Sequence, residues 1–289
     1  MKLRLGLPKG SLEKATLDLF EQAGWKITIP NRSYFPTMDD EYIKCTMCRA
    51  QEMSRYIESG VLDAGITGKD WILENNSKVV VVTDLVYSKT STRPTKWVLA
   101  VPSNSNIKKM EELEDKKIAT ELVNFTKRYF KERGIKIYTE FSWGATEAKV
   151  ASGLADAIVE VTETGATISA HGLKIIEELM VSYPQLIANP KVWKDSWKRE
   201  KIEQIALLLK GALKAQHMVG LKMNVSKKRL EKIINILPSL NAPTISPLHQ
   251  HDWYAVESVI AVKEVRDLIP KLMKQGAEGI IEYPLYKVI

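Results

Sequence analysis

Short apolar runs and amphipathic stretches alternate along the first half of the chain. The apolar runs have the length of buried strands; they are LRLGL, LDAGIT, VVVVT and WVLAV. After the first run, Leu12, Leu19 and Ala23 share one face at helical spacing, which predicts a helix from Ser11, as N-cap, to a stop at Gly24. This alternation indicates an α/β fold with a parallel sheet.

A second set of strands and helices begins near Lys96. KIAT predicts a strand over 117–120, the segment 126–133 predicts a helix, and GATEAKVASG predicts a short helix. The segment SYPQLIANP then returns the chain to the first set, which predicts two lobes joined by two crossing strands. The expected boundaries are 1–95 plus 180–212 for lobe I and 96–179 for lobe II. A cleft between two lobes is the natural place for a ligand.

The pattern changes after a long amphipathic helix predicted over about 194–215. The remaining chain is predicted to form strand, helix, strand, strand, helix and strand. These segments are 217–225, 226–237, 243–246, 253–262, 263–275 and 278–288. The βαββαβ order is that of ferredoxin-like domains, in which helices cover one sheet face. We therefore expect a separate domain over 213–289.

The segment from Ala155 to Thr167 combines a buried strand with a polar turn. Ala155 to Val161 is almost entirely apolar, and the turn Thr162–Thr167 offers hydroxyl and backbone N–H donors around Gly165, which tolerates positive φ. Asp156 and Glu160 flank the strand and could bind sugar hydroxyls. The pattern suits a phosphorylated sugar or nucleotide, but helix capping alone also collects Thr and Gly at such junctions.

The bulk composition is that of a globular protein. The chain has 289 residues, 45% hydrophobic content and a net charge of +7. Because basic and acidic residues are interspersed, we expect polyphosphate substrates rather than nucleic acid. The N-terminus reads as a strand rather than a signal peptide, and no apolar run has the length of a membrane span, so we expect a cytoplasmic protein without a membrane partner.

The two cysteines, Cys45 and Cys48, have the C-x-x-C spacing of redox and zinc motifs. No second pair completes a zinc site, and the motif lies in a strand-like alternation. We interpret both as packing residues and expect no metal site made by the protein alone.

Several motifs occur in order from end to end of the chain. They are LPKGSLEKA, DAGITGKDW, KWVLAVP, GATEA, the threonine turn 162–167 and PTISPL. In these motifs the chain resembles the ATP phosphoribosyltransferases that open histidine biosynthesis, in their long form with a C-terminal regulatory domain. The resemblance implies a two-lobed, periplasmic-binding-protein-like core followed by an ACT-like domain that binds histidine as a feedback inhibitor.

The resemblance also implies a reaction and its partners. ATP and 5-phosphoribosyl diphosphate would give N1-(5-phosphoribosyl)-ATP and pyrophosphate. Mg²⁺ would be coordinated mostly by substrate oxygens. It further implies dimers that associate into hexamers.

The resemblance implies roles for particular residues. Lys9 and Arg49 would stabilise the departing pyrophosphate, and Glu160 would bind the ribose hydroxyls, although the family more often has Asp there. The other substrate-binding candidates are Gly10, Gly65, Thr67, Gly68, Asp70, Glu147, Asp156, Thr162, Glu163, Thr164, Gly165, Ala166 and Thr167. The effector-binding candidates are Asn224, Thr244, Val259 and Gly279. Glu147 could instead stabilise a helix N-terminus.

Two other function classes compete with the enzyme. A two-lobed α/β protein could be a solute receptor that binds a ligand without turnover. A basic chain could bind nucleic acid, which would make binding steeply dependent on salt. The C-terminal domain could also serve only as an oligomer interface.

Overall fold

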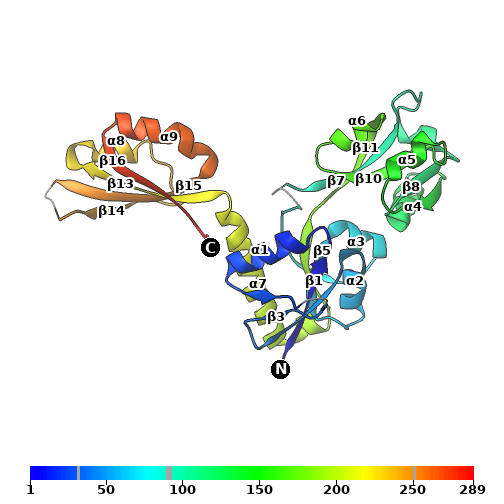
Figure 1. Ribbon diagram of the computed structural model, residues 1–289, viewed down its shortest axis with the longest axis horizontal. Coiled ribbons are helices and arrows are strands. Elements are labelled where there is room, and N and C mark those ends of the chain that lie inside the picture. The colour runs from blue at the N-terminus through cyan, green and yellow to red at the C-terminus, as the bar shows by residue number, and fades with distance from the viewer. Residues whose placement is uncertain (31–32, 89–92, 250–251) are drawn as a thin grey trace. The chain divides into compact units, whose positions relative to one another are not determined.

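The computed structural model describes residues 1–30, 33–88, 93–249 and 252–289 (Figure 1). The chain forms two compact units. The first comprises Met1–Glu21 and Trp25–Ala206, and the second comprises Gln22–Gly24 and Leu207–Ile289. Within the described ranges, every helix is too short or too polar to cross a membrane.

Lobe I of the first unit is built on a five-stranded sheet with the order β4-β1-β5-β12-β6. Its strands are β1 (Leu3–Lys9), β4 (Ile43–Arg49), β5 (Ala64–Gly68), β6 (Val80–Asp84) and β12 (Pro184–Ala188). A small hairpin, β2 (Ile27–Thr28) and β3 (Thr37–Met38), lies outside this sheet. The helices of the lobe are α1 (Glu13–Ala23), α2 (Ala50–Glu58) and α3 (Lys69–Asn75).

The expectation of a parallel sheet holds for only part of lobe I. β1 is parallel to β4 and β5, whereas β12 is antiparallel to both β5 and β6. The reason is that β12 follows β11 (Leu173–Ser182) after a single residue, with no helix to turn the chain around. It therefore enters the sheet in the opposite direction to β5.

Lobe II is built on a second five-stranded sheet with the order β11-β7-β10-β8-β9. The other strands are β7 (Thr95–Pro102), β8 (Lys117–Thr120), β9 (Tyr138–Phe141) and β10 (Ala157–Thr162). Its helices are α4 (Val123–Lys131), α5 (Thr146–Ala151), α6 (Ala166–Ala170) and the 3₁₀ turn Met110–Leu113. This sheet is also mixed, since β10 is parallel to β8 but antiparallel to β7. Trp97 and Phe130 are among the large side chains fully buried in its core.

The chain crosses between the two sheets twice, from β6 to β7 and from β11 to β12. Two α/β lobes with two crossings form a periplasmic-binding-protein-like core, so the predicted fold class is confirmed.

The predicted first helix is shorter than expected, because residues 11–12 form a turn before α1. There the backbone N–H of Gly10 donates to Glu13 Oε2 (3.2 Å), and no cap by Ser11 is seen.

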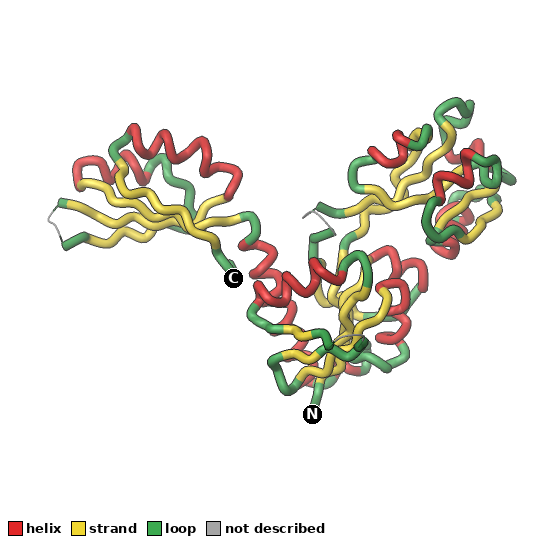
Figure 2. Tube along the Cα trace, in the orientation of Figure 1, coloured by secondary structure: helices red, strands yellow, loops and turns green. Residues whose placement is uncertain are grey.

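A 3₁₀ turn (Val192–Lys194) and the long helix α7 (Ser196–Ala215) lead into the second unit, whose sheet has the order β14-β15-β13-β16. Its strands are β13 (Met218–Ser226), β14 (Thr244–Pro247), β15 (Trp253–Ala261) and β16 (Ala277–Pro284), and its helices are the 3₁₀ turn Lys227–Arg229, α8 (Leu230–Ile234) and α9 (Val262–Lys274). All neighbouring strands are antiparallel, and Figure 2 shows the helices on one face of the sheet. The expected ferredoxin-like domain is therefore confirmed, although α8 ends three residues earlier than predicted.

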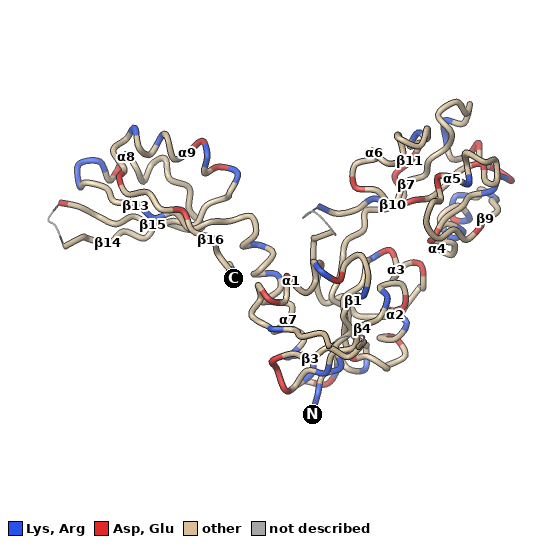
Figure 3. Tube along the Cα trace, viewed as in Figure 1, with Lys and Arg blue, Asp and Glu red and all other residues tan. Residues whose placement is uncertain are grey.

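The charged residues are interspersed along the described chain. Figure 3 shows Lys and Arg on helices and strands of both units, with Asp and Glu among them. This distribution agrees with the sequence, which offered no continuous basic stripe for nucleic acid.

Candidate active site

Two cavities of the first unit lie where the two lobes meet. The larger, of about 640 Å³, is lined by residues of both sheets and both crossing segments. The smaller, of about 510 Å³, opens between α2, α3 and the start of α4. Five lining residues belong to both cavities, which therefore adjoin; they are Arg49, Gln51, Trp71, Glu121 and Trp143.

The threonine turn lies on the wall of the larger cavity. Gly165 has φ +80°. Its backbone N–H donates to Thr162 Oγ1 (2.8 Å), and the N–H of Ala166 donates to Thr164 Oγ1 (3.3 Å). These bonds hold the turn in shape before any ligand binds, and they use two of the N–H donors that the sequence assigned to a phosphate.

Four side chains of this turn face the larger cavity; they are Thr162, Glu163, Thr164 and Thr167. Ser88 Oγ donates to Glu163 Oε1 (2.7 Å), which ties the turn to the segment that follows β6. Gly165 itself is buried, and Ala166 does not line the cavity.

Arg49 stands at the C-terminal end of β4 and reaches both cavities. Its register partner in the parallel strand β1 is Lys9, so both cations lie at the same sheet edge. Gly10 has φ +105°, and a Cβ there would lie 2.9 Å from Arg49 Nη1, so this glycine leaves room for the arginine. Lys9 does not line either cavity; its Nζ lies 4.2 Å from the ring centroid of Tyr34, in a cation–π contact.

Asp70, at the start of α3, joins the two lobes. Its Oδ2 accepts a hydrogen bond from Trp97 Nε1 on β7 (2.8 Å), and its backbone N–H donates to Ser182 Oγ (3.2 Å). Burial raises the pKa of Asp70, although the bond from Trp97 opposes that rise. A Cβ on Gly68 would lie 2.0 Å from Asp70 Oδ1, so only glycine fits there.

Glu74, at the other end of α3, makes a second link between the lobes. Its carboxylate accepts the backbone N–H groups of Asn124 (3.0 Å) and Phe125 (2.8 Å) at the first turn of α4. Arg128 of α4 donates in return to the carbonyl of Leu73. A carboxylate at a helix N-terminus is favourable, and here it comes from the opposite lobe.

Two other candidates of the AGITGKDW motif lie inside lobe I instead. Thr67 is fully buried, and its Oγ1 donates to the carbonyl of Ala50 (2.7 Å). A Cβ on Gly65 would lie 2.8 Å from Met53 Sδ of α2. The structure brings neither residue to a cavity, because both belong to a strand that is buried on both faces.

Glu160 and Glu121 lie side by side at the C-terminal edge of the lobe II sheet. β8 and β10 are parallel, and Thr120 pairs with Val159 one residue before each glutamate. Burial raises the pKa of Glu160, against hydrogen bonds from Thr146 and from the N–H of Val161. Burial, followed by the negative charges of Glu160 and Asp70, raises the pKa of Glu121 to about 7.

The other two acidic candidates lie away from the cavities. Asp156 precedes β10, and its carboxylate accepts the N–H of Lys117 (2.9 Å) and pairs with Lys116 (3.8 Å). A six-residue strand spans roughly 20 Å, so Asp156 is at the wrong end of β10 to reach the threonine turn. Glu147, on α5, raises the pKa of Glu160 but lines neither cavity.

Sequence reasoning missed Glu121 and the aromatic side chains of the cleft. Trp143 is 71% exposed and Phe141 is 61% exposed, yet both line the smaller cavity. Trp71 adds a third aromatic wall. The signal available in the sequence was FSW immediately before GATEA, an aromatic pair at a turn in which Ala145 has φ +49°.

The chain is similar in sequence to known proteins along almost its whole length. A family model described as ATP phosphoribosyltransferase matches residues 49–211, and a second, described as the C-terminal domain of HisG, matches residues 215–287. The ATP phosphoribosyltransferase of Desulfosudis oleivorans is 62% identical over 287 residues, which are 99% of each chain. ATP phosphoribosyltransferase 1 of Geobacter sulfurreducens is 58% identical over the same share. The chain belongs to the ATP phosphoribosyltransferase family.

This membership confirms the resemblance to the long form, because both family models match. The chain is therefore a pentosyltransferase of histidine biosynthesis, which decides for an enzyme over the solute receptor and the nucleic-acid module. Among solved structures, the ATP phosphoribosyl transferase (HisG:HisZ) complex from Thermotoga maritima is similar, with 29% identity and a TM-score of 0.62. The match covers 72% of this chain and 96% of that one, so about a quarter of this chain has no counterpart there.

The predicted effector residues of this ATP phosphoribosyltransferase share one region of the second unit. Asn224 on β13 and Val259 on β15 alternate with core residues of their strands, and therefore lie on the sheet face away from the helices. Thr244 pairs with Glu257, which is on the same face of β15 as Val259, so Thr244 shares this face. A Cβ on Gly279 would lie 3.5 Å from Asn224 Nδ2, so these two residues are neighbours. On the same face the ring of Tyr283 covers Gly220, and its hydroxyl donates to Glu257.

The cysteines of this enzyme behave as packing residues. Cys45 and Cys48 are three residues apart on β4, so their side chains point to opposite faces, and both are free thiols. Burial raises the pKa of each thiol to about 12, which removes the thiolate that redox or zinc chemistry requires.

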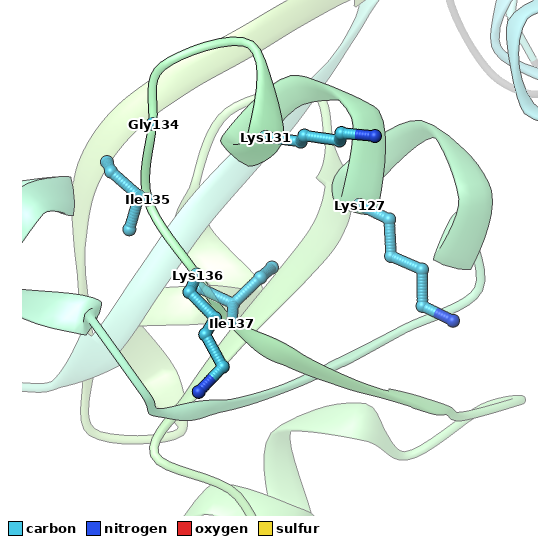
Figure 4. Close-up of a pocket in the computed structure, with 6 residues that line it drawn as sticks. All are labelled: Lys127, Lys131, Gly134, Ile135, Lys136 and Ile137. Atoms are coloured by element: carbon cyan, nitrogen blue, oxygen red, sulfur yellow. The ribbon is translucent and has the colours of Figure 1, made fainter.

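A third depression, of about 370 Å³, lies on lobe II between the end of α4 and the chain that precedes β9. Lys127, Lys131 and Lys136 surround it, but Figure 4 shows their amino groups pointing in different directions. They do not converge on one anion, and the depression is no alternative to the cleft as a phosphate site.

Proposed function

We propose that the chain transfers the 5-phosphoribosyl group from 5-phosphoribosyl diphosphate to N1 of ATP, and that histidine inhibits this reaction. The observation that carries the proposal is the pair of adjoining cavities in the cleft. One has a preformed threonine turn on its wall, the other has exposed aromatic rings, and Arg49 reaches both. This arrangement suits two phosphorylated substrates that meet at a shared opening.

The larger cavity suits 5-phosphoribosyl diphosphate. Thr162, Thr164 and Thr167 present hydroxyl donors to it. The backbone N–H groups of Gly165 and Ala166 hold the turn in shape, so we assign the phosphate mainly to these hydroxyls. Glu160 lies two residues before the turn and beside Glu121, which lines this cavity, and we assign the ribose hydroxyls to it. Asp156 is not included in this proposal, because of its contacts with Lys116 and Lys117.

The smaller cavity suits ATP. Purine rings stack on aromatic side chains, and Trp71, Phe141 and Trp143 supply such surfaces. Arg49 and Arg55 supply positive charge for phosphate oxygens in the same cavity.

The chemistry requires positioning and charge rather than a strong base. The N1 lone pair of adenine forms a bond to the anomeric carbon, and the bond from that carbon to pyrophosphate breaks with its electron pair. Arg49 stabilises the negative charge that develops on the pyrophosphate oxygen. The hydrogen bonds that Asp70 and Glu74 make between the lobes keep the two cavities next to each other.

Mg²⁺ fits this site as a partner of the substrates. Across the residues that the structure describes, no three His, Cys, Asp or Glu side chains gather to hold a metal ion. We therefore propose that Mg²⁺ binds mainly through pyrophosphate oxygens and water, in keeping with its reluctance to dehydrate.

A direct assay tests the proposed reaction. The protein is mixed with ATP, 5-phosphoribosyl diphosphate and Mg²⁺, and pyrophosphate release and the absorbance of the adduct are followed together. We expect both signals to rise in equal amounts. The absence of both signals from folded protein would contradict the proposal.

A change at Trp143 tests the assignment of the smaller cavity. Trp143→Ala removes an exposed stacking surface, and we expect the KM for ATP to rise about tenfold, since stacking contributes roughly 1 to 3 kcal/mol per base. Trp143 also lines the larger cavity, so the KM for 5-phosphoribosyl diphosphate should rise as well, but by a smaller factor than the KM for ATP. Tyr138→Ala is the matched control, because Tyr138 is an exposed aromatic of β9 that lines neither cavity.

A change at Asn224 tests the regulatory role. We expect Asn224→Ala to raise the histidine concentration for half-inhibition about tenfold, as the loss of one hydrogen bond to a charged ligand would do. The rate without histidine reports any damage to the catalytic unit. Lys263→Ala, on the exposed start of α9, is the control, and equal inhibition of all three proteins would contradict the assignment.

The family resemblance also supports an assembled state. We propose dimers that associate into hexamers, which sedimentation velocity with and without histidine would detect.

A further inference from the structure

Glu121 lines both cavities, where the two adjoin. The residues described as lining both cavities include one carboxylate side chain, Glu121, and one cationic side chain, Arg49. Glu121 follows the last residue of β8, and the next helix, α4, begins two residues later. Its side chain is therefore fixed at a sheet edge rather than carried on a long loop.

The transfer reaction of the proposed function, on which this inference rests, separates charge where the two cavities adjoin. Adenine is neutral before the reaction and becomes a positively charged ring when N1 bonds to the anomeric carbon. The positive charge spreads over N1, C6 and the 6-amino group, while the negative charge moves to pyrophosphate. A site that stabilises both charges places a negatively charged side chain beside the ring and a positively charged side chain beside the pyrophosphate.

We propose that the Glu121 carboxylate accepts a hydrogen bond from the adenine 6-amino group and stabilises the positive charge that develops on the ring. No proton moves in this step: N1 gains the bond to carbon, pyrophosphate leaves with the electron pair, and both amino hydrogens stay in place. Glu121 is thus a catalytic residue on the nucleophile side, as Arg49 is on the leaving-group side.

The electrostatics around Glu121 favour a cationic ring. The charged groups that act on it are Glu160 on β10 and Asp70 on α3, both negative, and burial also disfavours its charged form. Its pKa of about 7 means that the empty site holds a proton for part of the time at neutral pH. A positive ring relieves the repulsion among these acids, so the site binds the transition state better than it binds neutral ATP.

The sign of the pH dependence follows from this arrangement. Only ionised Glu121 stabilises the ring, and it ionises as the pH rises through about 7 in the free enzyme. We expect kcat/KM of the wild-type enzyme to increase across that range. Glu121→Gln has no carboxyl group to ionise there, so its profile should lack this limb.

The experiment compares Glu121→Gln with the wild type and with Glu132→Gln. Glu132 is an exposed residue at the end of α4, and its change removes the same charge from the same lobe outside the cavities. We expect Glu121→Gln to lower kcat about 100-fold, to change either KM less than about threefold, and to lose the acid limb. Glu121→Asp, which keeps the charge, should recover part of the rate. Glu132→Gln should match the wild type.

A binding measurement removes the dependence on turnover. N1-methyl-ATP carries a positive ring at neutral pH, and its methyl group occupies the position of the transferred sugar. In calorimetry, Glu121→Gln should bind N1-methyl-ATP at least tenfold more weakly than the wild type, and ATP less than about threefold more weakly. If this variant does not fold, the wild-type preference for N1-methyl-ATP over ATP is measured against pH, and it should rise through pH 7.

The outcomes separate the two proposals. A wild-type enzyme that transfers the phosphoribosyl group, beside a folded Glu121→Gln with unchanged kcat, acid limb and N1-methyl-ATP affinity, would overturn the role of Glu121 alone. A flat preference for N1-methyl-ATP across pH 5 to 9 would also overturn it. A wild-type enzyme without transfer would overturn the proposed function, and the inference with it.

Discussion

Replacing Arg49 with glutamine should lower kcat by about 100- to 1,000-fold while the protein stays folded. Arg49 is the one cation described on the wall of the larger cavity, and it also reaches the smaller one. The negative charge on pyrophosphate grows as its bond to the ribose breaks. The loss of the arginine therefore destabilises the transition state more than it destabilises the bound substrates. Initial rates over both substrate concentrations would separate kcat from the two KM values.

Two comparisons make the Arg49 prediction specific. Arg55→Gln removes a cation that lines the smaller cavity alone, and it should act mainly on the KM for ATP. Free guanidinium ion added to Arg49→Ala should restore part of the rate, because the missing charge can be supplied in solution. An unchanged kcat in Arg49→Gln would show that pyrophosphate leaves elsewhere in the cleft.

Replacing Gly165 with valine should raise the KM for 5-phosphoribosyl diphosphate at least 100-fold. Gly165 has φ +80°, a conformation that β-branched residues avoid, and an added Cβ would lie 3.2 Å from Ile175 Cδ1. The turn would have to change shape, which would move the hydroxyls of Thr164 and Thr167 away from the phosphate. Titration with the substrate in calorimetry would measure the loss directly.

Gly134→Val is the matched control for this turn. Gly134 lies in the same lobe with φ +73°, and a Cβ there would meet nothing within 4 Å. Both valine variants should unfold at a lower temperature, because both force a side chain into the left-handed region. Only Gly165→Val should lose the substrate. Equal binding by the two variants would mean that the turn does not hold the phosphate.

Much of the fold could be predicted because it depends on local pattern. The apolar run at 117–120 predicts a strand, and the apolar stripe before Ala215 predicts a helix. Neither prediction depends on where the rest of the chain lies. The direction of β12 could not be predicted, because its apolar sequence is the same for a parallel and an antiparallel strand. That direction depends on how β11 delivers the chain to the sheet.

The candidate site divides in the same way. The threonine turn was predicted because a buried strand that runs into a glycine-containing polar turn is visible in the sequence, whereas Arg49 was predicted from the family resemblance. Asp156 was expected at the site because it flanks the strand of the threonine turn, yet it lies at the opposite end of that strand. Thr67 was expected there because it belongs to the motif DAGITGKDW, yet its side chain points into lobe I. Which end of a strand a residue occupies, and which face it points to, is set by the neighbouring strands.

By itself, the sequence determined the order of the elements, the strain-tolerant glycine of the phosphate turn and the family to which the motifs belong. The tertiary structure alone decided which distant side chains meet. It paired Asp70 with Trp97, joined Glu74 to the start of α4, and set Glu121 between two cavities. The physical reason is that a helix or strand is specified by neighbours in the chain. The meeting of distant side chains depends on how the strands pair and where the chain crosses between the lobes, and both are set only when the sheets pack.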